Sequence, residues 1–283
     1  MIARRKLLVE SSAVPAAIGR TTEAHRARFE ELRGDAPLHT STYVRKELLR
    51  RWVVDYVRLA RMIAESPSVA DALRRLSHDF SVRAKGSYLN ALADLELLRA
   101  RCADPSDVRQ IARKFAHAAL QLVWDFDGVF EGRIENKSAC RIGDLEVPAD
   151  GNDLVDGLVA FCKRLEEPVR DCAVNTFLDF GNADGHVAKL LTCKGVARLK
   201  KVREPLATFA SERRWITCHE CGQIGDPVIA LEHAAQAAPS EYRLVHTDHA
   251  FDRYCPCLGL DHERLPAAIA LDKQAEARSD APG

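Results

Sequence analysis

Residues 6–12 of the chain read KLLVESS, a short apolar run that is followed at once by an acid and two serines. Residues 244–248, LVHTD, repeat this pattern near the other end of the chain. Short apolar runs bounded by polar residues predict strands. A second short strand is predicted at residues 38–40, and helical patterns lie between the runs, over residues 22–33 and from Ser41 onward. Strands that alternate with helices predict an α/β fold with a parallel sheet.

The composition is that of a globular protein. Hydrophobic residues make up 47% of the 283 residues, which is enough to build a core and excludes disorder of the whole chain. The 41 basic and 41 acidic residues cancel, so a globally basic nucleic-acid-binding surface is excluded, whereas a local basic patch is not. No apolar run approaches the ~18 residues of a membrane span. We therefore expect no membrane partner.

The first ten residues briefly resemble a signal peptide. Their apolar part is only three residues long and ends in an acid, so this interpretation is rejected. We therefore expect a cytoplasmic protein. In that compartment the nine cysteines are expected to be thiols or metal ligands rather than disulfides.

The pattern predicts a discontinuous domain. Residues 1–100 and 215–272 are assigned to one α/β domain, and residues 101–214 to a mainly helical insertion with cysteines. Residues 273–283 are polar and are expected to form a flexible tail. Helices are predicted over residues 44–60, 69–76, 88–101, 107–126, 153–167 and 227–238.

Four acids stand where elements end or begin. Glu10 and Asp248 follow predicted strands, and Glu47 and Asp226 lie near the starts of predicted helices. In an open parallel sheet, ligands bind beyond the carboxyl ends of the strands. Clustered carboxylates need a counter-cation, and their hard oxygens suit Mg²⁺ or Mn²⁺. Such ions activate water and stabilise charge on a phosphate, which indicates a phosphodiester hydrolase.

Each acid also has a simpler interpretation. Asp226 is well placed to cap a helix with Pro227 in its first turn. Glu47 fits an ion pair with Arg51 one helical turn later. The other two acids fit turns that follow strands. The functional interpretation therefore rests on all four acids together.

Four blocks of the chain resemble the PIN-domain nuclease family. They are KLLVESS (6–12), LHTSTYVRKELL (38–49), IGDPVIAL (224–231) and VHTDHAF (245–251). The resemblance covers roughly residues 3–65 and 215–260. It implies a three-layer α/β/α sandwich around a parallel sheet. It also implies divalent-metal-dependent cleavage of RNA, and less often of other nucleic acids.

The resemblance implies a role for each matching residue. Glu10, Glu47, Asp226 and Asp248 would hold Mg²⁺ or Mn²⁺. A metal-bound water would attack the phosphorus in line, without a covalent enzyme intermediate. Ser11 would support the first acid, Thr247 would hydrogen-bond near the site, and Asp252 would be an additional acid.

The chain departs from the family pattern in two ways. The family usually has Asp at the first position, and Glu10 is longer by one methylene group. The spacing between Glu47 and Asp226 is also much longer than in compact members. One alternative is therefore a scaffold that is catalytically weak or inactive and binds nucleic acid or a protein. Another is a nuclease that acts only within a larger complex. Because the family includes toxin–antitoxin ribonucleases, an inhibitory protein partner also fits, as does a homo-oligomer.

Cys218 and Cys221 form a CxxC pair, which is half of a tetrahedral zinc site. The missing ligands would come from Cys140, Cys172 or Cys193, while free thiols are the alternative. Cys162 shares the apolar face of a predicted helix and is expected to belong to the core.

A basic segment lies before the CxxC pair. Its residues would contact phosphates, whereas the alternative is a solvated helix face. The residues assigned to nucleic-acid binding are Lys194, Arg198, Lys200, Lys201 and Arg203. The chain lacks the glycine-rich and nucleophile motifs of nucleotide-fuelled enzymes, dehydrogenases and serine hydrolases.

Overall fold

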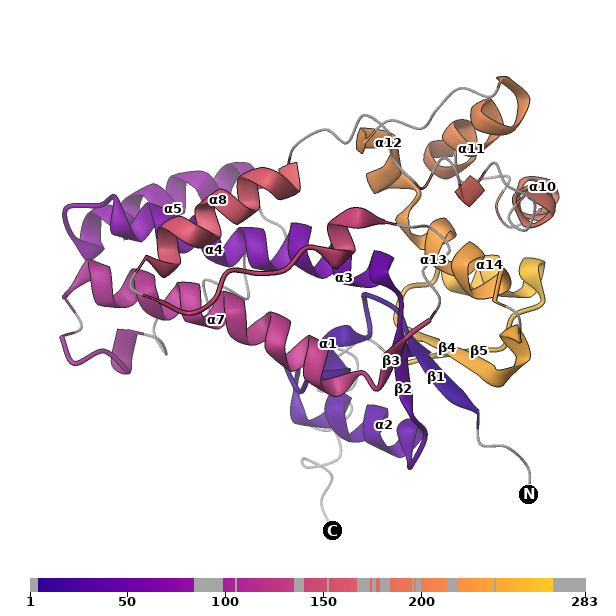
Figure 1. The fold of residues 1–283 in the computed structure, drawn as a ribbon, viewed down its shortest axis with the longest axis horizontal. Helices are drawn as coiled ribbons and strands as arrows, with labels where there is room; N and C mark the ends of the chain where they lie inside the picture. Colours follow the sequence, from indigo (N-terminus) through magenta and orange to yellow (C-terminus); the bar gives the residue numbers. More distant parts are fainter. Residues whose placement is uncertain are drawn as a thin grey trace, which may run out of the picture. The chain divides into compact units, whose positions relative to one another are not determined.

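A computed structural model of the chain contains a five-stranded sheet in which every pairing is parallel (Figure 1). The strand order is β3-β2-β1-β4-β5, so the first strand lies at the centre. Leu8 and Val9 of this strand are fully buried. The fold is therefore α/β, as the sequence predicts. The strands are β1 (Lys6–Val9), β2 (Leu38–Thr40), β3 (Gly132–Arg133), β4 (Tyr242–His246) and β5 (His262–Arg264).

The chain divides into two compact units, and each is described by itself. The sheet unit comprises Met1–Arg45, Gly128–Asp144 and Pro168–Gly283, and the helical unit comprises Lys46–Asp127 and Leu145–Glu167. The structure describes residues 5–83, 99–104, 106–134, 140–151, 153–166, 174, 177–178, 184–194, 196, 200–212, 218–236 and 238–266.

Helices of the sheet unit lie on both faces of the sheet. The connection from β1 to β2 contains α1 (Val14–Ala17) and α2 (Glu23–Arg33), and the connection from β4 to β5 contains α14 (Phe251–Leu258). These two connections run in opposite directions across the sheet. Because parallel crossovers are right-handed, their helices cover opposite faces. This arrangement is compatible with a three-layer α/β/α architecture (Figure 1).

The remaining helices of the sheet unit precede β4 or connect the strands. α13 (Gly225–Ala234) packs against α14, and α10 (Asp184–Thr192) packs against both α14 and α11 (Lys200–Glu212). The short elements are α12 (Cys218–Gln223), η2 (Arg141–Asp144) and η3 (Pro239–Glu241).

The helical unit is built around α4 (Val54–Ala64), which packs against α5 (Val69–Arg83) and α8 (Leu154–Glu166). The ring of Tyr56 on α4 lies 6.1 Å from that of Phe115 on α7 (Val108–Val129), and both side chains are buried. α3 (Thr42–Leu48) crosses the division between the units and continues through a π-helical turn, η1 (Leu49–Val53), into α4. The π turn interrupts the regular helix that the four-residue spacing predicts.

The predicted domain boundaries differ from those of the structure. Residues 46–83 belong to the helical unit instead of the sheet domain, because the apolar face of α4 packs on α5 and α8. The described residues between 184 and 212 belong to the sheet unit instead of the insertion, because α10 packs on α13 and α14. The predicted tail and most of the predicted helix 88–101 lie outside the described residues.

No helix within the described ranges combines the length and the apolar character that crossing a membrane requires.

His233 is a fully buried imidazole on α13. Its Nε2 lies 3.2 Å from the carbonyl oxygen of Pro239, and its ring packs edge-on against Tyr242. Burial lowers the pKa of His233 to about 4, although the Pro239 carbonyl and the charge of Asp261 act in the opposite direction. The folded protein therefore holds this side chain in its neutral form.

Stability is predicted to fall in acid through His233. In the unfolded chain this histidine binds a proton below about pH 6.5. In the folded chain it binds a proton only below about pH 4, so the unfolded state is favoured between these two pH values. This contribution is complete above pH 6.5 and costs about 2–3 kcal/mol by pH 4.5. Urea unfolding at pH 7 and pH 4.5 measures it. The variant His233→Leu is expected to lose correspondingly less stability than the wild type between these two pH values, and an equal loss in both proteins would contradict the assignment.

Candidate functional site

Glu10 follows the central strand and is almost completely buried. Its backbone N–H continues the ladder by donating to the carbonyl of Val245 on β4, at 3.0 Å. Its carboxylate turns back onto the following loop. Ser11 Oγ donates to Oε1, and the backbone N–H and Oγ of Ser12 both donate to Oε2. The supporting contact that the resemblance implies for Ser11 is therefore present.

Ser12 connects the carboxyl ends of β1 and β4. Besides donating to Glu10, its Oγ accepts a hydrogen bond of 2.9 Å from the backbone N–H of Thr247. On the other side of β1, Thr40 Oγ1 donates to the carbonyl of Val9 at 3.1 Å. Three neighbouring strands are thus tied together at the edge where Glu10 lies.

Asp226 and Asp248 belong to other segments of the sheet unit. Asp226 lies in the first turn of α13, where Ile224 is the N-cap residue, so the simple capping role of Asp226 is wrong. Asp248 is exposed, and its Oδ1 accepts a 2.8 Å hydrogen bond from the N–H of Ala250. Burial raises the pKa of Tyr254 on α14, and the negative charges of Asp226 and Asp248 raise it further. The charges of both carboxylates therefore act on the Tyr254 hydroxyl.

The acids do not share one ion-sized space. Burial raises the pKa of Cys255, next to Tyr254, to about 12, and the charges of Asp252, Asp261 and Glu10 contribute to the shift. Within the described part of the chain, however, Glu10, Asp226 and Asp248 do not place three ligand oxygens within 4.8 Å of one another. Glu47, the fourth predicted acid, is half-buried on α3 and belongs to the helical unit.

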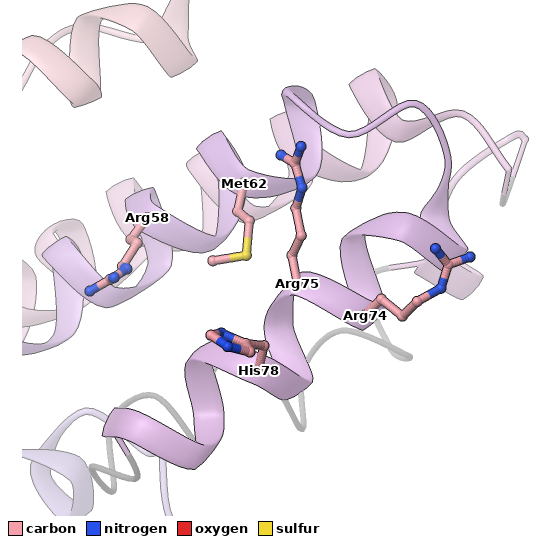
Figure 2. A pocket seen from close by; sticks show the side chains of 5 residues that line it. All are labelled: Arg58, Met62, Arg74, Arg75 and His78. Atoms are coloured by element: carbon pink, nitrogen blue, oxygen red, sulfur yellow. The ribbon is translucent and has the colours of Figure 1, made fainter.

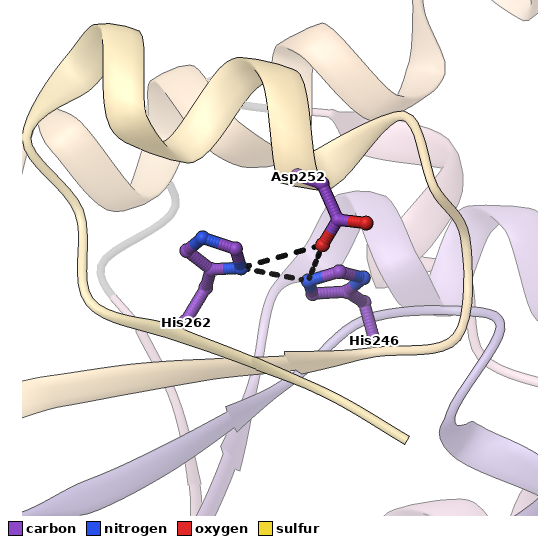
Figure 3. Close-up of side chains that lie close together, drawn as sticks. All are labelled: His246, Asp252 and His262. Carbon is purple, nitrogen blue, oxygen red and sulfur yellow. Dashed lines mark hydrogen bonds and ion pairs between the residues drawn. The ribbon is translucent and has the colours of Figure 1, made fainter. Parts of the chain in front are cut away.

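A different group of potential ligands lies under α14. His246, Asp252 and His262 place one ligand atom each within 4.8 Å of one another (Figure 3). Burial and the neighbouring His262 lower the pKa of His246 to about 4. Of these three residues, only Asp252 was expected at the site, as the additional acid that the resemblance implies. His262 lies on a polar three-residue strand that the pattern does not predict.

The cysteine predictions need correction. Cys193 forms a disulfide with Cys257, so it is not a zinc ligand, and the expectation of thiols or metal ligands is wrong for this pair. The fold brings the end of α10 and the end of α14 together, with Cα atoms 6.1 Å apart. The sequence contains no signal for this contact.

The remaining cysteines of the predicted zinc site are not assembled in the described residues. Cys221 is buried, and its Sγ lies 3.2 Å from the hydroxyl of Tyr43, which donates to the Cys221 carbonyl. Cys140 is buried and forms no disulfide, as is also true of Cys162, the predicted core residue. Cys172 and the side chain of Cys218 lie outside the described residues.

The predicted nucleic-acid contacts lie on the surface of the sheet unit. Lys194, Lys200, Lys201 and Arg203 are exposed, whereas Arg198 lies outside the described residues. Lys201 also lines a hollow of about 520 Å³ between α11 and α12. Since Glu204 and Glu220 line the same hollow, its charge is mixed.

A second hollow, of about 470 Å³, lies between α4 and α5 in the helical unit (Figure 2). Three arginines, a methionine and a histidine line it. None of them was singled out from the sequence, because they are separated by up to 20 positions and form no basic run. The lining residues are Arg58, Met62, Arg74, Arg75 and His78. The three guanidinium groups give this lining a positive character, and one of them, that of Arg74, is paired with Asp71 at 2.8 Å.

Comparison of the chain with models of protein families, with curated proteins and with solved structures gave no match.

The hydrogen bonds of Ser12 are predicted to hold the edge together. Ser12→Ala removes the Oγ that joins Glu10 to Thr247 and leaves the Thr247 N–H without its acceptor. We expect a loss of about 1–3 kcal/mol in the free energy of unfolding, measured in urea. Ser106→Ala is the matched control, because Ser106 donates to Asp104 on an exposed surface. Equal effects of the two substitutions would contradict the bridging role.

Proposed function

We propose that the sheet unit is a PIN-like domain and that the chain is a divalent-metal-dependent nuclease, with RNA as its substrate class. The strand order supports this proposal. The connections leave β1 towards one edge of the sheet and β4 towards the other, so the order reverses between these strands. Ligands of open α/β sheets bind at such a switch point, beyond the carboxyl ends of the strands. Glu10 and Asp248 follow these two strands.

One observation carries the proposal furthest. Asp226 and Asp248 belong to segments on opposite sides of β4 in the sequence, yet both charges act on the hydroxyl of the buried Tyr254. Bringing two carboxylates to one place is costly unless a cation or a donor compensates. A divalent cation bound between the two acids would provide this compensation.

The donor set fits a hard divalent cation. Asp226 is half-buried and Asp248 is exposed, so neither residue is enclosed in the core. Because Mg²⁺ keeps several of its waters, its ligands need not all touch one ion directly, which agrees with the separation of the three acids. Asp226 and Asp248 would hold the ion, with Glu10 beside them. Such an ion would supply a water of lowered pKa and charge stabilisation at the phosphate.

The chain's own residues orient the site. The hydrogen bond from Ala250 N–H fixes one oxygen of Asp248, and Ser11 and Ser12 fix the carboxylate of Glu10. The exposed basic side chains of α11, and separately the arginine-lined hollow of the helical unit, are suited to phosphate groups. RNA binding is therefore expected to weaken with salt. The role of Glu47 as a metal ligand stays a prediction from the sequence. The same holds for a protein inhibitor, a larger complex and a homo-oligomer as partners.

A non-catalytic scaffold is the second candidate, and the geometry of Glu10 favours it. Both oxygens of this carboxylate accept hydrogen bonds from the adjacent serines. A carboxylate whose two oxygens accept these hydrogen bonds stabilises the loop after β1 and is less available to bind a metal ion. Under this alternative the edge of the sheet is a structural junction, and binding depends on the basic surfaces.

Cleavage of RNA tests the proposal. We expect Mn²⁺-dependent cleavage of a mixed pool of single-stranded and structured RNAs by the wild type. The double variant Asp226→Asn, Asp248→Asn is expected to lose at least 100-fold in rate, because the metal ligands are gone. The matched control Asp104→Asn, Asp144→Asn changes two exposed aspartates and is expected to cleave like the wild type.

Two results would contradict the nuclease. One is equal cleavage by the wild type and by the Asp226/Asp248 variant, which would indicate a contaminant. The other is an inert wild type that still binds RNA, with the same affinity in the variant; this result favours the scaffold.

A further inference from the structure

His246, Asp252 and His262 converge from three elements of the sheet unit. His246 is the last residue of β4, Asp252 lies in the first turn of α14, and His262 is the first residue of β5. His246 Nε2 and His262 Nδ1 are 3.1 Å apart, and each nitrogen lies 3.8 Å from Asp252 Oδ1. In Figure 3 the two rings and the carboxylate point toward a common centre.

The size of this triangle matches a metal coordination shell. A point equidistant from the three atoms lies about 2.1 Å from each of them, which follows from the three separations. Bonds of Zn²⁺ to imidazole nitrogen and to carboxylate oxygen are about 2.0–2.2 Å long. An ion would therefore fit among the three atoms with little movement of the side chains.

The protonation of His246 is also that of a ligand. Its Nδ1 lies 2.8 Å from the backbone carbonyl oxygen of Asp248, which only accepts hydrogen bonds. Nδ1 must therefore carry the proton, and the lone pair of Nε2 faces the other two side chains. Metal-binding histidines commonly donate their second N–H to a backbone carbonyl, which fixes the tautomer and the ring.

Asp252 is oriented in a similar way. Its Oδ2 is hydrogen-bonded to Arg264, so Oδ1 is the oxygen that faces the rings. The three side chains range from fully buried to partly exposed, since the exposed fraction is 0% for His246, 23% for His262 and 34% for Asp252. One side of the cluster is thus open, which allows an ion to enter and a water to complete the shell.

We propose that His246, Asp252 and His262 bind a divalent transition-metal ion, Zn²⁺ in the first instance. Two imidazole nitrogens and one carboxylate favour Zn²⁺ over the Mg²⁺ that all-oxygen sites prefer. The ion ties β5, an edge strand of three residues, to β4 and α14. Asp252 then serves this site instead of acting as the additional nuclease acid that the resemblance implies. This proposal does not depend on the nuclease activity.

Metal binding by the full chain tests the proposal. The protein is stripped with a chelator and titrated with Zn²⁺ in competition with a chromophoric chelator, and with Co²⁺ while the visible spectrum is recorded. We expect one Zn²⁺ per chain at this site and a Co²⁺ spectrum without thiolate charge transfer. Substitution of a residue that contacts a ligand lowers metal affinity by roughly 10–100-fold. His262→Gln and Asp252→Asn remove ligands and are expected to lower the affinity for Zn²⁺ by more than this.

Matched variants separate this site from its neighbours. His249→Gln removes an exposed imidazole that lies next to Asp252 but outside the triangle, and it is expected to weaken Zn²⁺ binding by no more than the roughly 10–100-fold that the loss of a ligand's neighbour costs. The Asp226→Asn, Asp248→Asn variant is also expected to retain Zn²⁺. The test uses His262→Gln because His262 is partly exposed and its replacement is expected to leave the protein folded. Replacement of the fully buried His246 could prevent folding.

Three outcomes would overturn the proposal. They are a wild type that does not bind Zn²⁺, folded His262→Gln and Asp252→Asn variants with undiminished affinity, and a Co²⁺ spectrum dominated by thiolate charge transfer. The first would leave a hydrogen-bonded histidine pair beside an Asp252–Arg264 ion pair. The third would place the metal on cysteines instead.

Discussion

The parallel pairing of β1 with β4 is the constraint on which the rest of the sheet unit depends. β1 is the central strand, and the direction of the crossovers reverses between it and β4. The carboxyl ends of these strands are therefore left without a crossover above them. Ser12 closes the junction by joining Glu10 on one strand end to the backbone of Thr247 on the other. Glu10, Asp248 and His246 all lie at or just after the carboxyl ends of these two strands.

The segment after β4 serves two kinds of chemistry. The carboxylate of Asp248 acts on the Tyr254 hydroxyl together with Asp226, and these oxygens suit a hard cation. The backbone carbonyl of the same residue holds the ring of His246, whose nitrogen faces a set of ligands that suits zinc. An ion at the histidine cluster would thus fix the loop that carries Asp248. The two proposed sites are separate in their ligands and are coupled through one residue of the backbone.

The sequence predicts the strands and helices whose local residue pattern is sufficient to indicate them. β1 and β4 were predicted because each contains an apolar run, and α7 and α8 because their apolar residues recur at helical spacing. β2 (LHT) was predicted as a short strand between a turn signal and a helical pattern. β3 and β5 were missed because they are two or three residues long, are not apolar and are held by pairing alone. The π turn η1 and the Cys193–Cys257 disulfide depend on tertiary packing, which spacing does not report. For the same reason, the sequence singles out Asp252 but not the two histidines that lie beside it.

Anomalous scattering from crystals that contain Mn²⁺ would show directly whether the carboxyl edge between β1 and β4 binds a divalent cation. We expect a manganese peak at this edge, bounded by Asp226 and Asp248, that disappears in the Asp226→Asn, Asp248→Asn variant. No peak at this edge at millimolar Mn²⁺, with the Asp226 and Asp248 side chains ordered, would contradict it. The edge would then be a hydrogen-bonded junction and no more.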